Sequence, residues 1–402
     1  MITKTNKSIL IFLVFAFAFF ISNLLRSITA TLSPVLTSEF NLTAGNLGLL
    51  AGGYFLGFTS MQIPLGFLLD KHGPKKIVSS LLIIAIVGTT SFALAQNFAS
   101  LLISRVFIGI GVSACMMGPL TGYRIWFEEK YQQRANSWML MVANIGFVFS
   151  TLPVQVLLPI IGWRWIFFGT TFLIIVSIVL ILLFIPSTEK KFKKDENEIE
   201  VKLSDIWKNK FFISVIPLGF FNYGGMYAIQ TLWAGPWMIR VTGYSSLESA
   251  TGLFWINFTA LIGFFLWGYF LPIISKYGLN SFKLMKFGLP ISYLVLLSII
   301  IKGSNAGAFL FTIYILTSIV LTVVQPAVGL SFPKRLAGKS LTSYNLVIFL
   351  GTFIMQWGMG LIIDFSHSMG KSEILSFQIS FFVYFILCIF SYIFFVLKSR
   401  NT

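Results

Sequence analysis

Two arginines lie inside long apolar runs, where a charged side chain is costly. Arg26 belongs to the run 9–31 and Arg105 to the run 99–123. An ionisable residue within a membrane-length segment marks a functional site by default. A guanidinium offers a planar, fixed fork of N–H donors that suits carboxylate and phosphate groups. The pair therefore indicates a binding site for a small anion.

Each arginine also has a structural interpretation. Arg26 precedes Pro34 by about two helical turns, so its side chain can snorkel to the outer interface. Arg105 can instead be a structural or gating residue bound to backbone carbonyls. Both alternatives stay open from the sequence.

The carboxylates strengthen the anion interpretation. None of the 13 Asp and Glu residues falls at mid-span, and Asp70, Glu248 and Asp364 stand at span ends. A cavity that holds the two arginines would be net positive, which favours an anionic or zwitterionic substrate over a cationic drug.

Polar side chains recur in a later apolar run, 211–238. Tyr223, Tyr227 and Gln230 follow the i, i+4, i+7 spacing and so share one helical face. Gln325, beside Pro326, is a further candidate for substrate contact. The alternative is that these groups pair one helix with another.

These residues must be positioned by membrane-spanning helices. The chain of 402 residues is 56% hydrophobic and only 10% charged, whereas soluble domains carry roughly 25% charged residues. Helices satisfy their own backbone hydrogen bonds in lipid, and a span needs about 20 apolar residues. We expect an all-α membrane protein with twelve transmembrane helices. The predicted spans are 9–31, 45–69, 75–95, 99–123, 135–160, 164–186, 211–238, 248–272, 283–302, 306–331, 340–364 and 374–397.

The net charge of +16 follows the predicted topology. With the N-terminus inside, the inner loops hold 23 of the 29 Lys and Arg residues and the outer loops hold four. This bias obeys the positive-inside rule and places both termini in the cytoplasm of a multi-pass inner (plasma) membrane protein. The charge is therefore explained without a nucleic-acid partner. Neither cofactor nor metal is expected, since Cys115 and Cys388 fall inside apolar runs as small core residues.

The chain divides into two similar halves. A polar segment, 187–210, separates residues 1–186 from residues 211–402 and is expected to be a cytoplasmic linker. Gly66 and Gly268 occupy matching positions in the two halves, and so do Pro119 and Pro326. We therefore expect two pseudo-symmetric six-helix bundles.

Three motifs carry a family resemblance. A tight turn with positive φ is expected at Gly73, between the second and third predicted spans. The turn lies in a loop that resembles the signature loop between helices 2 and 3 of the major facilitator superfamily. The matching residues are Gly66, Asp70, Lys71, Gly73, Lys75 and Lys76. The span-four sequence Arg105-x-x-x-Gly109-x-Gly111 and the sequence Gly162-Trp163-Arg164-Trp165 resemble further marks of that superfamily, with some likeness to its nitrate and sugar-phosphate permease branches.

The resemblance implies a monomeric, non-enzymatic carrier that moves a small solute by alternating access. Helices 1, 4, 7 and 10 of the family line the cavity, which places Arg26 and Arg105 there. The resemblance also implies a cytoplasmic latch in which Asp70 accepts hydrogen bonds from the start of span eleven, near 340–342. Glu128 and Glu129 would pair with the loop lysines.

Two other functions compete with this interpretation. One is proton-coupled efflux of drugs or metabolites, but the Gly-Pro pair of drug antiporters is replaced here by Ser150-Thr151. The other is a membrane sensor that binds ligand on the same fold without transporting it.

Overall fold

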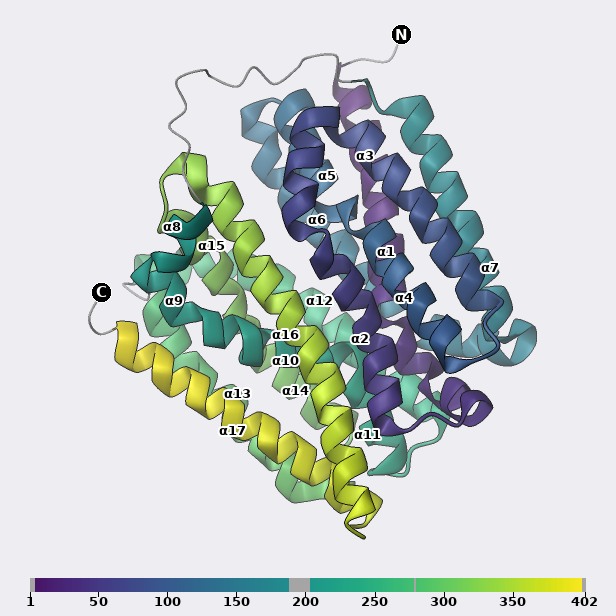
Figure 1. Cartoon of the computed structure of the whole chain (residues 1–402). Helices are drawn as coiled ribbons and strands as arrows, with labels where there is room; N and C mark the ends of the chain where they lie inside the picture. Colours follow the sequence, from purple (N-terminus) through teal and green to yellow (C-terminus); the bar gives the residue numbers. More distant parts are fainter. Residues whose placement is uncertain (1–3, 188–202, 278–279, 400–402) are drawn as a thin grey trace. The chain divides into compact units, whose positions relative to one another are not determined.

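The computed structural model describes residues 4–187, 203–277 and 280–399 (Figure 1), and in these ranges every regular element is a helix. Contacts group the chain into two compact units, residues 1–28 with 53–198 and residues 29–52 with 199–402. The membrane fold expected from composition is confirmed. The division at the 187–210 linker stays a prediction, and residues 188–202 of that segment lie outside the described ranges.

Seven helices precede the predicted linker. They are α1 Lys4–Phe40, α2 Ala44–Ser60, α3 Gln62–Ala93, α4 Phe98–Val112, α5 Ala114–Trp126, α6 Glu129–Phe149 and α7 Leu152–Phe184. The unit boundaries fall within α1 and α2, so that residues 29–52 belong to the second unit.

The second unit continues from the predicted linker to the C-terminal helix. Its later elements are α8 Leu203–Lys208, α9 Lys210–Pro217, η1 Leu218–Tyr223, α10 Gly224–Ala228, η2 Ile229–Trp233, α11 Ala234–Arg240, α12 Ser246–Lys276, α13 Ser281–Lys302, η3 Gly303–Asn305, α14 Ala308–Ser318, η4 Ile319–Val323, α15 Val324–Leu330, α16 Lys334–Ser368 and α17 Glu373–Ser399.

Ten helices of the described residues are long and apolar enough to cross a membrane, against twelve expected spans. The difference arises at two helix breaks. The predicted span 45–69 is divided at Met61, between α2 and α3, and the span 135–160 at Ser150 and Thr151, between α6 and α7. The Ser150 and Thr151 hydroxyls donate to the carbonyls of Phe147 and Val148, an alternative bonding pattern that favours the end of a helix. The count of twelve stays a prediction.

Two glycines join helical limbs without a loop. Gly73, inside α3, has φ 76° and ψ 161°, and Gly162, inside α7, has φ 76° and ψ 159°. This region of backbone space is essentially restricted to glycine. The positive φ expected at Gly73 is confirmed.

The helix of residues 210–240 is irregular. Two of its segments, η1 and η2, are π-helical, and α10 separates them. π-Helical turns are rare and often accompany functional sites. Tyr223 and Gln230, both predicted to contact substrate, lie in these segments.

Candidate functional site

Glycines set the position of Arg105 by letting α4 approach its neighbours. An added Cβ at Gly109 would stand 2.0 Å from the Tyr54 carbonyl oxygen, and one at Gly111 would stand 2.2 Å from the Ala85 nitrogen. A Cβ at Gly57 would stand 2.1 Å from the Val106 oxygen. The backbones of α2, α3 and α4 therefore touch directly. The glycines of the span-four motif thus bring Arg105 against the middle of α2, at Gly53 and Tyr54.

Arg105 is fully buried and only partly hydrogen-bonded. Its Nη1 donates to the Leu25 carbonyl of α1 at 2.9 Å, and its guanidinium carbon lies 5.5 Å from the centroid of the Tyr54 ring. Within the described part of the chain, Nε and Nη2 have no hydrogen-bond partner. The Leu25 contact is the kind that a structural arginine would make. Nε and Nη2 are therefore buried donors that the structure leaves unsatisfied.

Arg26 packs on the same aromatic surface. Its side chain is 5% exposed, and its guanidinium carbon lies 5.6 Å from the Tyr54 centroid and 5.1 Å from that of Phe58. The Tyr54 hydroxyl donates to the Ser22 carbonyl at 3.1 Å, which fixes the ring. Tyr54 thus contacts both guanidiniums, so the two cationic groups lie in one buried region of the first unit. Aromatic faces stabilise cations without cancelling their charge.

The break between α6 and α7 adjoins this region. The Ser150 hydroxyl lies 2.7 Å from the hydroxyl of Ser27, the residue after Arg26. The Ser-Thr pair that departs from the drug-antiporter pattern therefore packs against α1 next to one of the two arginines.

The candidates on the second unit separate into two kinds. The rings of Tyr223 and Tyr227 stack at 5.3 Å with an angle of 7° between their planes, as a shared helical face requires. Gln230 instead donates to Asn257 of α12 at 2.9 Å, and Gln325 donates to Asn345 of α16 at 2.6 Å. Both glutamines make helix-to-helix hydrogen bonds, which is the alternative role. Substrate contact by these four residues stays a prediction.

A buried polar network in the second unit was not identified from the sequence. The Tyr293 hydroxyl donates to Asn222 Oδ1 at 2.8 Å, and Asn222 Nδ2 donates to the Ser391 hydroxyl at 2.5 Å. The Tyr314 and Tyr384 hydroxyls lie 2.7 Å apart. The neutral polar residues of the spans were the available signal, but spacing along one helix does not reveal partners on another.

The residues of the signature loop lie within α3, on either side of its non-helical Gly73. Asp70, Lys71 and Lys76 are exposed, Lys75 is half-buried, and nothing lies within 4 Å of a Cβ placed on Gly66. Glu128 is exposed and directly precedes α6, while the Glu129 side chain lies outside the described part of the structure. The pairing of this loop with span eleven stays a prediction.

We expect Asp70→Ala to lower the transport rate several-fold while leaving the folded yield unchanged. An exposed ion pair contributes only ~0–1 kcal/mol, so the effect must come from a contact that matters during transport. The measurement is uptake at equal amounts of protein, with Asp205→Ala as the matched control, because Asp205 is an exposed carboxylate on α8 outside this loop. Wild-type rates for Asp70→Ala would rule out the proposed latch.

Membrane-length helices that enclose two buried arginines define a membrane transport protein rather than a soluble ligand-binding domain. Residues 15–356 match the profile of the Major Facilitator Superfamily, so the chain belongs to this family of transporters.

Curated relatives of the chain differ in their named substrates. It is 27% identical over 146 residues to the probable sulfoacetate transporter SauU of Cupriavidus necator, a match that covers 36% of this chain and 34% of that protein. It is 28% identical over 206 residues to the quinolone resistance protein NorA of Staphylococcus aureus, which covers 50% of this chain and 52% of that protein. The chain thus spans about a third of the length of SauU and about half of the length of NorA.

A solved structure confirms the fold over nearly the whole chain. It is an inward-facing, unoccupied bacterial homologue of the human lysosomal transporter Spinster, with a TM-score of 0.77 and 17% sequence identity. The match covers 98% of this chain and 97% of that one.

Proposed function

We propose that this transporter carries a small organic or inorganic anion by alternating access, and that Arg105 and Arg26 bind the anion. The observation that carries the proposal is the unused edge of the buried Arg105 guanidinium, where Nε and Nη2 lack partners.

The geometry of Arg105 suits this role. Nη1 is held by the Leu25 carbonyl, which leaves the Nε and Nη2 edge as a two-donor fork. Such a fork matches two oxygens of one carboxylate or phosphate group. A buried, uncompensated cation costs several kcal/mol, and an anion on this edge offsets that cost.

Arg26 supports the same choice of substrate. It shares the Tyr54 ring with Arg105, so a small anion held by one guanidinium experiences the field of both. The sequence places no Asp or Glu at mid-span, which favours an anionic over a cationic substrate. The name of the SauU relative, which specifies an anion, agrees with the proposal.

Efflux of drugs or metabolites is the second candidate, favoured by the similarity to NorA over half of the chain. The two candidate functions differ in their cargo. A net positive site would bind anions and repel cationic drugs. The proposal also includes a monomeric carrier in the inner membrane with both termini cytoplasmic, as the distribution of Lys and Arg favours.

A thermal-shift screen of the purified protein in detergent tests the proposal. The ligand panels are anions, zwitterions and cations, applied to wild type, to Arg26→Gln and to Arg164→Gln as the matched control. A ligand that binds the native state raises its apparent melting temperature by mass action. We expect an anion to stabilise wild type and Arg164→Gln but not Arg26→Gln.

Other outcomes of the screen have definite meanings. Stabilisation by cations or apolar drugs alone would overturn the anion proposal and favour efflux. An anion that stabilises the protein but shows no flux in proteoliposomes would identify a sensor instead of a transporter.

A further inference from the structure

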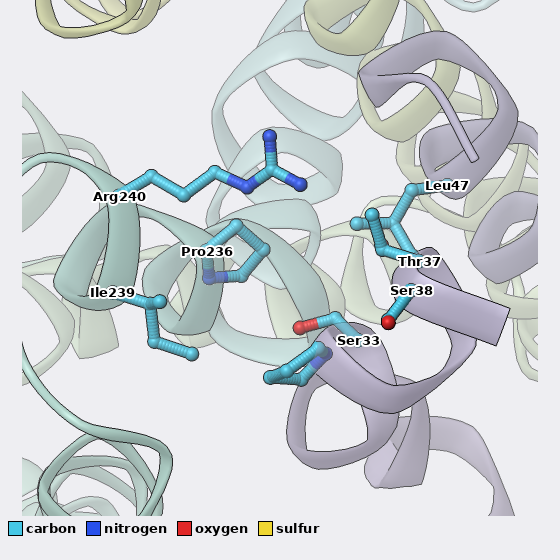
Figure 2. A pocket seen from close by; sticks show the side chains of 8 residues that line it. Ser33, Thr37, Ser38, Leu47, Pro236, Ile239 and Arg240 are labelled. Atoms are coloured by element: carbon cyan, nitrogen blue, oxygen red, sulfur yellow. The ribbon is translucent and has the colours of Figure 1, made fainter. Parts of the chain in front are cut away.

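A cavity of about 290 Å³ lies within the second unit, where residues near the ends of α1 and α11 meet the start of α2 (Figure 2). We call it the α1–α11 cavity. Its apolar lining comes from Pro34, Leu47, Pro236 and Ile239. Among the described residues that line it, Arg240 is the one charged residue. The cavity is therefore an apolar space with a single cationic group, and the two arginines of the first unit do not contribute to it.

Closely packed helices form one side of the cavity. Proline has no N–H, so Pro34 deprives the Ala30 carbonyl, four residues earlier, of its helical donor. The Ser33 hydroxyl donates to that carbonyl at 2.8 Å instead. α11 approaches the same point, since a Cβ placed on Gly235 would stand 3.0 Å from the Ala30 oxygen. This side of the cavity is therefore made of packed helix backbone and not of a loop.

Two polar groups of the lining keep bonding capacity for a ligand. The Thr37 hydroxyl is buried and has no hydrogen-bond partner among the described residues. The Arg240 side chain extends from α11 toward Thr37 and Leu47 (Figure 2). In the part of the chain that the structure describes, its guanidinium forms one hydrogen bond, from Nη1 to Glu373. A guanidinium has five N–H donors, so most of them remain for an anion.

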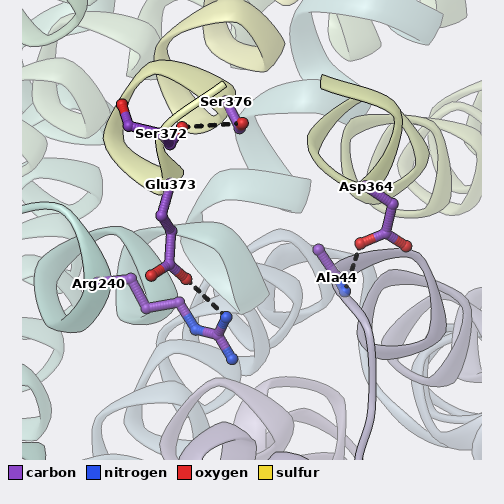
Figure 3. Close-up of polar contacts among 6 residues, drawn as sticks. All are labelled: Ala44, Arg240, Asp364, Ser372, Glu373 and Ser376. Atoms are coloured by element: carbon purple, nitrogen blue, oxygen red, sulfur yellow. Dashed lines mark hydrogen bonds and ion pairs between the residues drawn. The ribbon is translucent and has the colours of Figure 1, made fainter. Parts of the chain in front are cut away.

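The ion pair between Arg240 and Glu373 is one that a ligand can replace. Nη1 and Oε1 lie 2.7 Å apart (Figure 3), and the two side chains are 37% and 45% exposed. An exposed pair contributes little stability, because solvent screens it. The other carboxylate in Figure 3, Asp364, accepts the Ala44 N–H at 2.9 Å and so belongs to the start of α2. A carboxylate from solution therefore competes with Glu373 alone for the guanidinium.

We propose that the α1–α11 cavity is a second anion site, which takes an organic anion with a compact apolar body. The carboxylate or sulfonate group of the ligand replaces Glu373 on Arg240, and the Thr37 hydroxyl donates to one of its oxygens. The apolar body lies against Pro236 and Ile239, where loss of water-exposed apolar area favours binding. The inference rests on the proposed function for the charge of the ligand, but it does not involve the arginines of the first unit.

Protection of a cysteine in the cavity lining tests the proposal. Ser38 lines the cavity and is exposed, so Ser38→Cys is placed in a Cys115→Ala/Cys388→Ala background. Its labelling by a water-soluble maleimide is timed in detergent with increasing benzoate, benzamide or inorganic phosphate. We expect saturating benzoate to slow labelling about fivefold or more. Benzamide lacks the charge and phosphate lacks the apolar body, so each should need a concentration at least about tenfold higher.

The two partners of the ion pair should act in opposite directions. Glu373→Gln removes the competing carboxylate, so the benzoate concentration for half-protection should fall about three- to fivefold. Arg240→Gln removes the partner of the anion, so that concentration should rise about tenfold or more. The matched controls are Glu248→Gln at the start of α12 and Lys302→Gln at the end of α13, both exposed. Each should stay within about twofold of wild type.

Several results would contradict the second site. Shifts in the same direction for Glu373→Gln and Arg240→Gln would overturn it, because a purely structural ion pair loses the same bond in either variant. Equal protection by benzamide and benzoate would exclude an anionic ligand. Ile239→Cys, on the other helix of the cavity, serves as a second reporter, so the test does not depend on the folding of Ser38→Cys.

The labelling reports on the cavity alone, so the two proposals can fail separately. A thermal shift that requires Arg26, with no protection at either reporter, would overturn the second site and keep the proposed function. Protection at both reporters without such a shift would overturn the proposed role of Arg26 and keep the second site.

Discussion

Arg105→Lys is expected to weaken anion binding by about 100-fold or more, even though the positive charge is kept. Lysine carries its three donors on a single nitrogen, so it cannot offer a planar two-donor edge to the ligand while a separate nitrogen binds the Leu25 carbonyl, as the guanidinium can. Hydrogen bonds to charged groups are worth about 1.5–3 kcal/mol each. Loss of one hydrogen bond to the anion, together with the bond to the Leu25 carbonyl, therefore accounts for a roughly 100-fold weaker affinity. The measurement is the concentration of anion that half-saturates the thermal shift, with uptake into proteoliposomes as the second readout.

The matched control is Arg124→Lys, because Arg124 lies exposed at the end of α5. It should bind and transport like wild type. Wild-type affinity in Arg105→Lys would show that only charge matters at this position. That result would exclude two-donor hydrogen bonding by Arg105 from the proposed mechanism.

Gly109→Ala is expected to have the largest effect on folding. The new methyl group would meet the Tyr54 carbonyl oxygen at 2.0 Å, and backbone atoms cannot yield as a flexible side chain does. Overpacking of this kind costs about 3 kcal/mol. The displaced α4 would also carry Arg105 away from Tyr54. We expect a sharp fall in monodisperse yield and apparent melting temperature, measured by size-exclusion chromatography and thermal unfolding.

Gly169→Ala is the control for this experiment. Gly169 lies on α7, and nothing lies within 4 Å of a Cβ built there. It should behave like wild type or gain slightly, because alanine favours helix. Equal yields for both variants would mean that α2 and α4 can move apart without a loss of stability. That result would contradict the close backbone contact described at Gly109.

Local features could be predicted well from the sequence. The long apolar runs predicted a helical membrane fold, because backbone N–H and C=O groups in lipid must form hydrogen bonds within their own segment. The turn at Gly73 followed from a glycine between two such runs, and its φ of 76° agrees. Burial of Cys115 and Cys388 was also expected and is confirmed.

Features that depend on a distant partner could not be predicted. Gln230 lay on the expected face of its helix, yet its partner, Asn257, is on α12. Asp364 was recognisable only as a carboxylate at a span end, and its bonds reach α2, 320 residues away along the chain. The breaks after Ser60 and at Ser150 were not predicted. At each one a serine hydroxyl donates to the carbonyl three residues earlier, and hydropathy does not detect such bonds.

The joints at Gly73 and Gly162 have a mechanical consequence. Each connects two helical limbs through a single non-helical residue, so the connection contains no slack. A long loop has many backbone torsions that can absorb a displacement of one limb, whereas a one-residue joint has only the φ and ψ of its glycine. The two ends that meet at Gly73, and the two that meet at Gly162, must therefore stay together when either limb changes its orientation.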